Sequence, residues 1–215
     1  MDSRRAESFS DGVFAVAITV LVFNLLPIAT ATVRSLDTRA LLDHWPAYLA
    51  YVVSFLTIGI MWLNHHWMFS AVTRVNRPVL VLNLLLLMGI VAIPFPTALV
   101  ADHLNDGAAG KVATVTYGLV MIAISIPFAL LWLYMAAHQH ELGARRRVRT
   151  PRLSTLRFTA GNAGYVTGTI IAVFVPVAAL IIFGLLAVYY LFSHLPDPAT
   201  DEAADGGGDR ATEPS

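Results

Sequence analysis

The chain has 215 residues, of which 57% are hydrophobic and only 13% are charged. Soluble domains carry about 25% charged residues, so this composition excludes an ordinary soluble protein and indicates that lipid is the main solvent. The absence of cysteine excludes disulfides, iron–sulfur clusters and cysteine-based zinc sites. We therefore expect a lipid bilayer as the environment, and neither a cofactor, a metal site nor a nucleic-acid partner.

Apolar runs predict an all-α integral membrane protein with six transmembrane helices. The uncharged runs cover residues 12–33, 44–73, 78–101, 112–139 and 158–196. A spanning helix needs about 20 apolar residues, so the first four runs each predict one helix. One helix over the whole last run would be roughly 58 Å long, whereas the hydrocarbon core is about 30 Å thick. We predict two helices there, with a turn near Val175-Pro176; one tilted or partly emergent helix is the alternative.

The positive charges predict an orientation. With six spans, one side of the membrane holds the N-terminus and the second and fourth loops, and it carries ten arginines: Arg4, Arg5, Arg74, Arg77, Arg145, Arg146, Arg147, Arg149, Arg152 and Arg157. The other side holds only Arg34, Arg39 and Lys111. The positive-inside rule therefore places both termini in the cytoplasm.

The chain divides into two predicted parts. Residues 1–195 form the membrane domain, and residues 196–215 form an acidic tail that we expect to be disordered, because it has few apolar side chains to bury.

Polar residues open the first helix, in the stretch 5–14 that contains Arg5, Phe9, Ser10 and Asp11. Ionisable groups are expensive in lipid, so we expect Asp11 to face protein. On a helical wheel the residues Val16, Thr19, Val20, Phe23 and Pro27 form one stripe. Asp11 points about 140° away from that stripe. Taken alone, the stripe fits either a pore lining or an ordinary helix-packing seam.

The second span supplies polar groups at the same depth as Asp11: Trp62, Asn64, His65 and His66. Lipid offers these side chains no hydrogen-bond partners, so we predict a buried network between the two helices. The histidines also allow proton sensing or a haem or quinone site, in which His66 is joined by His138 or His140.

The string Arg5-x-x-x-Phe9-Ser10-Asp11 followed by Gly-Val-Phe-Ala-Val-Ala-Ile-Thr resembles the first helix of the transmembrane protein 175 potassium channel family, in its bacterial branch. The run Trp62-Leu63-Asn64-His65-His66 is similar to the second helix of that family. The resemblance implies a homotetrameric potassium channel, not an enzyme, in the bacterial plasma membrane. It implies that the first helices line a central pore and that potassium is the permeant ion.

The resemblance also implies roles for the stripe. Val16 corresponds to the apolar constriction, Thr19 to a position implicated in potassium preference, and Val20 and Phe23 to further pore-lining rings. Val16 is smaller than the Ile or Leu often found there, and Phe23 is bulkier than the usual aliphatic residue, so both rings are candidates for the narrowest point. Asn24 replaces a position that is often acidic in the family.

Two other classes remain open from the residues alone. One is the haem- or quinone-binding electron carrier described above. The other is a secondary transporter, since Pro94-Phe95-Pro96 and Pro127 interrupt the third and fourth spans.

Overall fold

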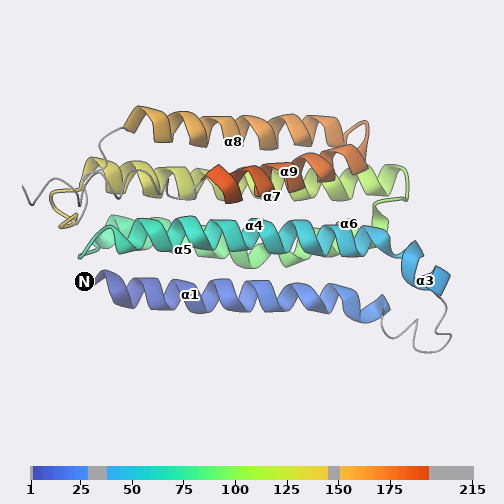
Figure 1. Cartoon of the computed structure of the whole chain (residues 1–215), viewed down its shortest axis with the longest axis horizontal. Helices are drawn as coiled ribbons and strands as arrows, with labels where there is room; N and C mark the ends of the chain where they lie inside the picture. The colour runs from blue at the N-terminus through green and yellow to red at the C-terminus, as the bar shows by residue number, and fades with distance from the viewer. Residues whose placement is uncertain (1, 29–37, 145–150, 194–215) are drawn as a thin grey trace, which may run out of the picture.

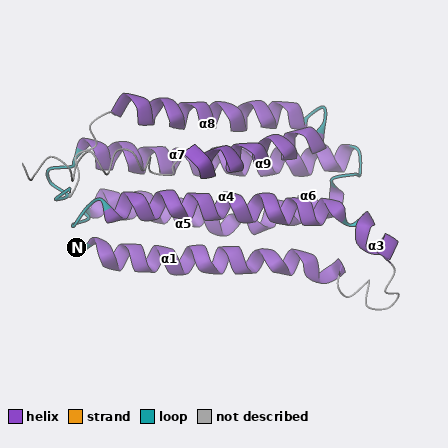
Figure 2. Ribbon diagram, viewed as in Figure 1, coloured by secondary structure: helices purple, strands orange, loops and turns teal. Residues whose placement is uncertain are grey.

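The computed structural model describes residues 2–28, 38–144 and 151–193, and these residues form helices joined by short turns (Figure 2). In chain order the elements are α1 (Ser3–Val20), the 3-10 helix η1 (Leu21–Leu25), α3 (Thr38–Asp43), α4 (Trp45–Ser70), α5 (Arg77–Ala92), α6 (Pro94–His103), α7 (Ala108–Ala137), α8 (Pro151–Ala172) and α9 (Pro176–Ser193). The described part contains no strand, only an isolated bridge between Asp2 and Arg74. The predicted all-α class is confirmed.

The long helices run side by side, with α1 along one edge of the molecule and α8 along the opposite edge (Figure 1). α1 packs on α4 and α5, and α7 packs on α5, α6 and α8. The beginning of α1 therefore lies at the same end of the molecule as the turn between α4 and α5, as expected for helices that alternate in direction across a bilayer (Figure 1).

Four segments of the described chain are long and apolar enough to cross a membrane: Ser3–Ile28, Trp45–Ser70, Arg77–His103 and Ala108–Ala137. These segments contain the first four uncharged runs or most of them. α9 is apolar but shorter, and α8 begins among arginines and has a much less apolar composition. Four spans are therefore recognised directly, and the full count of six stays a prediction.

Prolines mark the ends of the later helices. α8 ends at Ala172 and α9 begins at Pro176, so the predicted break near Val175-Pro176 is present. Proline suits the first position of a helix because that position needs no backbone donor. The same rule explains the junction between α5 and α6, which falls just before Pro94. Pro127, by contrast, lies inside α7, which continues through it.

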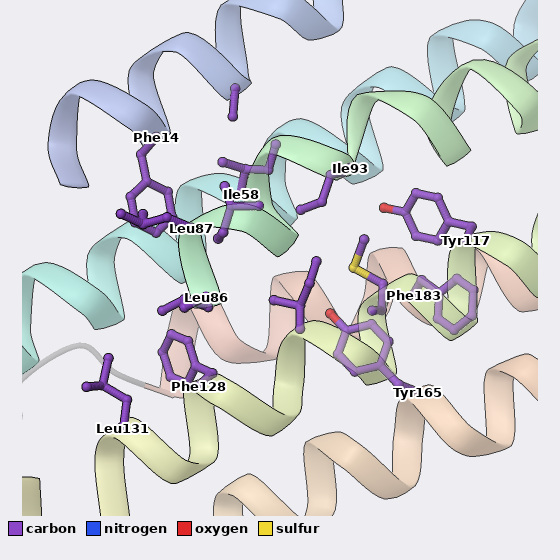
Figure 3. Packing of buried hydrophobic residues seen from close by; sticks show 14 of the residues in the cluster. Phe14, Ile58, Leu86, Leu87, Ile93, Tyr117, Phe128, Leu131, Tyr165 and Phe183 are labelled. Carbon is purple, nitrogen blue, oxygen red and sulfur yellow. The ribbon is translucent and has the colours of Figure 1, made fainter. Parts of the chain in front are cut away.

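The core consists of apolar side chains from all the long helices (Figure 3). Phe14 points from α1 toward Leu87, and Tyr117, Tyr165 and Phe183 gather where α7, α8 and α9 meet (Figure 3). Tyr117 and Phe183 stack with their ring centroids 5.6 Å apart. α1 therefore belongs to the packed subunit and is not a detached anchor.

The domain limit predicted at residue 195 and the tail at 196–215 lie outside the described residues.

Candidate functional site

The candidate site is α1 together with the groups that hold it. One face of α1 is buried against α4 and α5 and carries Ala6, Ser10, Phe14 and Ala17, and Leu21 of the following η1 continues it. Steps of three and four residues keep side chains on one side of a helix. The two small alanines in this row allow the neighbouring helices to approach closely, as is usual for helix contacts in membranes.

A hydrogen-bonded chain fixes this buried face. His65 Nε2 of α4 donates to Asn83 Oδ1 of α5 at 2.8 Å, and Asn83 Nδ2 donates to Ser10 Oγ of α1 at 2.9 Å. Ser10 Oγ donates in turn to the carbonyl of Ala6 at 2.9 Å. The three side chains are fully or almost fully buried. Lipid offers them no substitute partners, so the chain joins three helices in one alignment.

The ring of His65 is positioned on both sides by aromatic groups. It stacks on Phe69 with ring centroids 4.3 Å apart and lies 5.4 Å from the ring of Phe14. Because Asn83 Oδ1 can only accept, Nε2 carries the proton in this arrangement. Nδ1 is buried and has no hydrogen-bond partner among the described residues.

Two further polar contacts lie at the start of α1. Trp62 Nε1 donates to Asp11 Oδ1 at 2.9 Å, and His66 Nδ1 lies 2.9 Å from Glu7 Oε1. Both partners come from α4, one helical turn apart. Asp11 therefore faces protein within its own subunit, on the side turned toward α4.

The backbone adds a third tie at the very beginning of the helix. Ser3 N and Ser3 Oγ donate to the carbonyls of Thr73 and Val72, at 3.2 and 2.9 Å. The backbone N–H groups of Thr73 and Arg74 donate to the carbonyl of Leu142, just after α7. The N-terminus of α1 is therefore bonded to the turn between α4 and α5, and the same turn is bonded to the segment that follows α7.

Asn64, a predicted member of the network, lies elsewhere. It lines a cavity between α4, α7, α8 and α9, because one residue along a helix turns the side chain by about 100° from His65. Asn83 supplies the amide instead. Arg5 and Phe9 are exposed, and Arg5 makes no side-chain bond to another described residue.

Asn83 and Glu7 were not predicted as members of the network. For Asn83 a signal did exist, because it is the one amide in the apolar run 78–101. A lone amide in a membrane helix needs a partner, and both α1 and α4 carry polar side chains at a matching depth. Glu7 lies four residues before Asp11, so the two acids share a side of the helix.

The side of α1 that points away from α4 and α5 carries most of the predicted stripe. Val16 is 58% exposed, Thr19 is also exposed, and Phe23 of the following η1 is 60% exposed. Val20 is half-buried. Thr19 Oγ1 donates its only proton to the carbonyl of Val16 at 2.9 Å, so the lone pairs of Thr19 Oγ1 remain free to accept.

Two of the three histidines considered for a haem or quinone site, His66 and His138, make other contacts. No group of three or more metal-ligating side chains occurs among the described residues. His66 is paired with Glu7, and His138 stacks on Tyr134 with its Nδ1 3.0 Å from the carbonyl of the same residue.

Comparison with known proteins decides the family. The family described as "Endosomal/lysosomal potassium channel TMEM175" matches residues 5–94, which contain most of α1 and all of α4 and α5. A protein of Streptomyces collinus named a potassium channel is 42% identical over 203 residues, covering 94% of this chain and 98% of its own length. The chain belongs to the TMEM175 family. It is thus a membrane channel protein and not an enzyme, and the electron-carrier alternative finds no support.

Other members extend the comparison. A potassium channel of Chamaesiphon minutus is 40% identical over 153 residues, covering 66% of this chain and 75% of its own length. The crystal structure of a potassium-selective TMEM175 homologue from the same organism superimposes with a TM-score of 0.73 and 34% identity, covering 89% of this chain and 97% of that one. Chicken TMEM175, named a proton channel, is 31% identical over 152 residues, covering 66% of this chain but only 30% of its own length.

Proposed function

We propose that this TMEM175 member is a potassium-permeable cation channel of the bacterial plasma membrane, formed by four copies around a central pore. Its relatives from Streptomyces and Chamaesiphon are named potassium channels. In the proposed assembly six spans cross the bilayer, α8 and α9 included, and both termini lie in the cytoplasm.

The observation that carries the proposal is the two-sided character of α1. On one side Ser10 is bonded to α5 and Asp11 to α4, and the other side is largely exposed in the single chain. Within an apolar stretch of 18 residues, 22% of the residues are buried in the first span, against 44%, 39% and 33% in the other three. In the proposed assembly, copies arranged with these exposed sides toward one axis enclose the pore.

Apolar rings then form the gate. A narrow hydrophobic neck excludes water and so blocks ions. Rings of Val16 and Phe23 fill this role, and a dilation or rotation of the four α1 helices opens it. The groups around Ser10, Asp11, Asn83 and His65 anchor the helix and do not touch ions.

Thr19 supplies the polar contact between the two apolar rings. Its hydroxyl already donates to the carbonyl of Val16, so it presents oxygen lone pairs toward the axis. Oxygen lone pairs are what a potassium ion needs in place of its hydration shell. Four such hydroxyls form a ring of acceptors one turn beyond the Val16 gate.

Potassium flux into liposomes tests the proposal. Purified protein, eluting as a folded oligomer, is reconstituted into vesicles with a potassium gradient, and uptake is compared with that of empty vesicles. We expect passive uptake that stops when the gradient is removed. Uptake no greater than in empty vesicles, from protein that is folded and inserted, would rule the channel out.

A further inference from the structure

A partly open cavity of about 80 Å³ lies inside the subunit, between α4, α7, α8 and α9. It is separate from the proposed pore, because it lies on the side of α4 that faces away from α1. The side chain of Asn64 enters it from α4 and that of Asn162 from α8. Both positions fall within helices of the membrane domain.

The cavity has a mainly apolar floor and a polar rim. The buried lining residues include Ile60, Phe128 and Ala187, together with Tyr165 and with Thr57, whose hydroxyl donates to the carbonyl of Val53. Asn64 and Asn162 are half-buried and therefore lie nearer the open side. Neither amide makes a hydrogen bond to another described residue. A half-buried amide has lost part of its contact with water and gains from a hydrogen-bond partner, so these two groups favour an occupant that supplies one.

The lining also restricts the charge of the occupant. It contains no lysine, arginine, aspartate, glutamate or histidine. A phosphate headgroup or an ammonium group would enter without a counter-charge, at a high cost in this environment. The occupant is therefore neutral, with an apolar body and a hydrogen-bonding group at one end.

The volume restricts its size. An engineered apolar cavity of about 150 Å³ binds benzene, and this one is about half as large and partly open. It encloses a small ring or a short alkyl chain whose polar end reaches the rim. We propose that this cavity is a binding site for small neutral amphiphiles of the phenol or alcohol class, oriented by Asn64 and Asn162.

Fluorine NMR of the purified oligomer in detergent tests the site with two probes, 4-fluorophenol and fluorobenzene, which differ in the hydroxyl group. Empty micelles give the background of simple partition. We expect saturable binding of 4-fluorophenol above that background. The Asn64→Leu and Asn162→Leu variants should each weaken it about three- to tenfold, the usual effect of one hydrogen bond, and should leave fluorobenzene binding nearly unchanged.

Two further variants test whether the probes bind in the cavity, one as a control outside it and one that fills it. Thr116→Val removes a hydroxyl of α7 that is bonded to the carbonyl of Val112 and does not line the cavity, so it should bind both probes normally. Ala187→Leu fills the floor and should reduce the binding of both.

The site would be refuted by 4-fluorophenol partition no greater than into empty micelles. Unchanged affinity of both asparagine variants for 4-fluorophenol would also refute it. The two amides would then be satisfied by bridging water, or the probe would partition without a specific site. Normal binding of both probes by Ala187→Leu would show that they bind elsewhere. None of these outcomes depends on ion flux, so the site and the channel proposal fail separately.

Discussion

Asn83 of α5 bonds to two neighbouring helices through one side chain. Its carbonyl oxygen accepts from His65 and its amide nitrogen donates to Ser10, so both ends of one planar group are used. No other residue type of similar size offers a donor and an acceptor in this geometry. It therefore connects the proposed pore helix to both helices behind it.

We expect Asn83→Ala to lower the free energy of unfolding by about 1–3 kcal/mol, because it removes two interhelical bonds and leaves the ring of His65 without its partner. Thermal unfolding in detergent, followed by tryptophan fluorescence, measures the change. Leu84→Ala, at the exposed neighbouring position, is the control and should change the midpoint much less. Equal losses in the two variants would contradict the assigned role.

Val16→Ala should increase potassium flux several-fold, since a smaller side chain widens the apolar ring and weakens dewetting. The liposome assay measures it, at equal amounts of inserted protein. Ile126→Ala changes an exposed aliphatic side chain of α7 and should leave the flux unchanged. A rise in both variants would indicate leaky vesicles, and a rise in neither would remove Val16 from the gate.

At the scale of single residues, the sequence predicted which side chains of the first helix need polar partners, but not every residue that supplies one. Ser10 and Asp11 are recognisable because polar groups at a membrane boundary need an explanation. Asn64 was assigned to the network by its proximity to His65, whereas a rotation of about 100° per residue places it in the cavity instead. Which amide faces which helix depends on tertiary packing, and a single sequence does not contain that information explicitly.

Among the elements, α7, α8 and α9 meet where Gly118 has no side chain. A Cβ atom added there would meet Thr169 Oγ1, and it would lie 3.1 Å from Cζ of Phe183. Thr169 cannot easily move, because its hydroxyl donates to the carbonyl of Tyr165 at 2.7 Å and its β-branched side chain is stiff. The close approach of α7 and α8 therefore depends on this glycine.

We predict that Gly118→Ala is less stable than Gly59→Ala by about 1–3 kcal/mol, the usual cost of overpacking. Gly59 has open space where a Cβ atom would be placed, so alanine there gains helix propensity at no steric cost. Both midpoints come from thermal unfolding in the same detergent. Partial recovery in the Gly118→Ala, Thr169→Ala double variant would identify the clash as the cause, and equal midpoints for the two single variants would contradict it.

Element boundaries were more predictable than element partners. Prolines and charged residues indicate where helices begin and end. For example, α9 begins at Pro176 and α6 begins at Pro94. The last uncharged run began at residue 158, but α8 begins earlier, at Pro151. Arginines are compatible with a helix that emerges from the membrane, so an uncharged run marks the apolar part of a helix and not its whole length.

For the whole molecule, the exposed side of α1 raises the question of what covers it. In the proposed assembly, other copies of the same chain cover it. Because the sequence contains no cysteine, single cysteines can be introduced to test this by cross-linking. We expect native mass spectrometry to give a particle of four times the 23.3 kDa chain mass. A dimer or monomer in mild detergent would contradict the tetramer.

A single cysteine introduced as Phe23→Cys should form covalent dimers on oxidation, because facing α1 helices bring equivalent residues together. The same oxidation of Ile126→Cys, on an exposed part of α7, should leave monomers on a denaturing gel. Cross-linking at both positions would indicate aggregation, and cross-linking only at residue 126 would reverse the assignment of the central helix.

The bonds between α1 and the later helices also determine when α1 can pack stably during synthesis of the chain. Ser10 is synthesised 73 residues before its partner Asn83. At about 5–20 residues per second, the ribosome needs roughly 4–15 s to cover that interval. Throughout this time Ser10 lacks its partner from α5, whereas the partners of Asp11 and Glu7, which are Trp62 and His66 of α4, are synthesised earlier. We therefore expect the stable packing of the proposed pore helix to begin only after the third long helix, α5, has been synthesised.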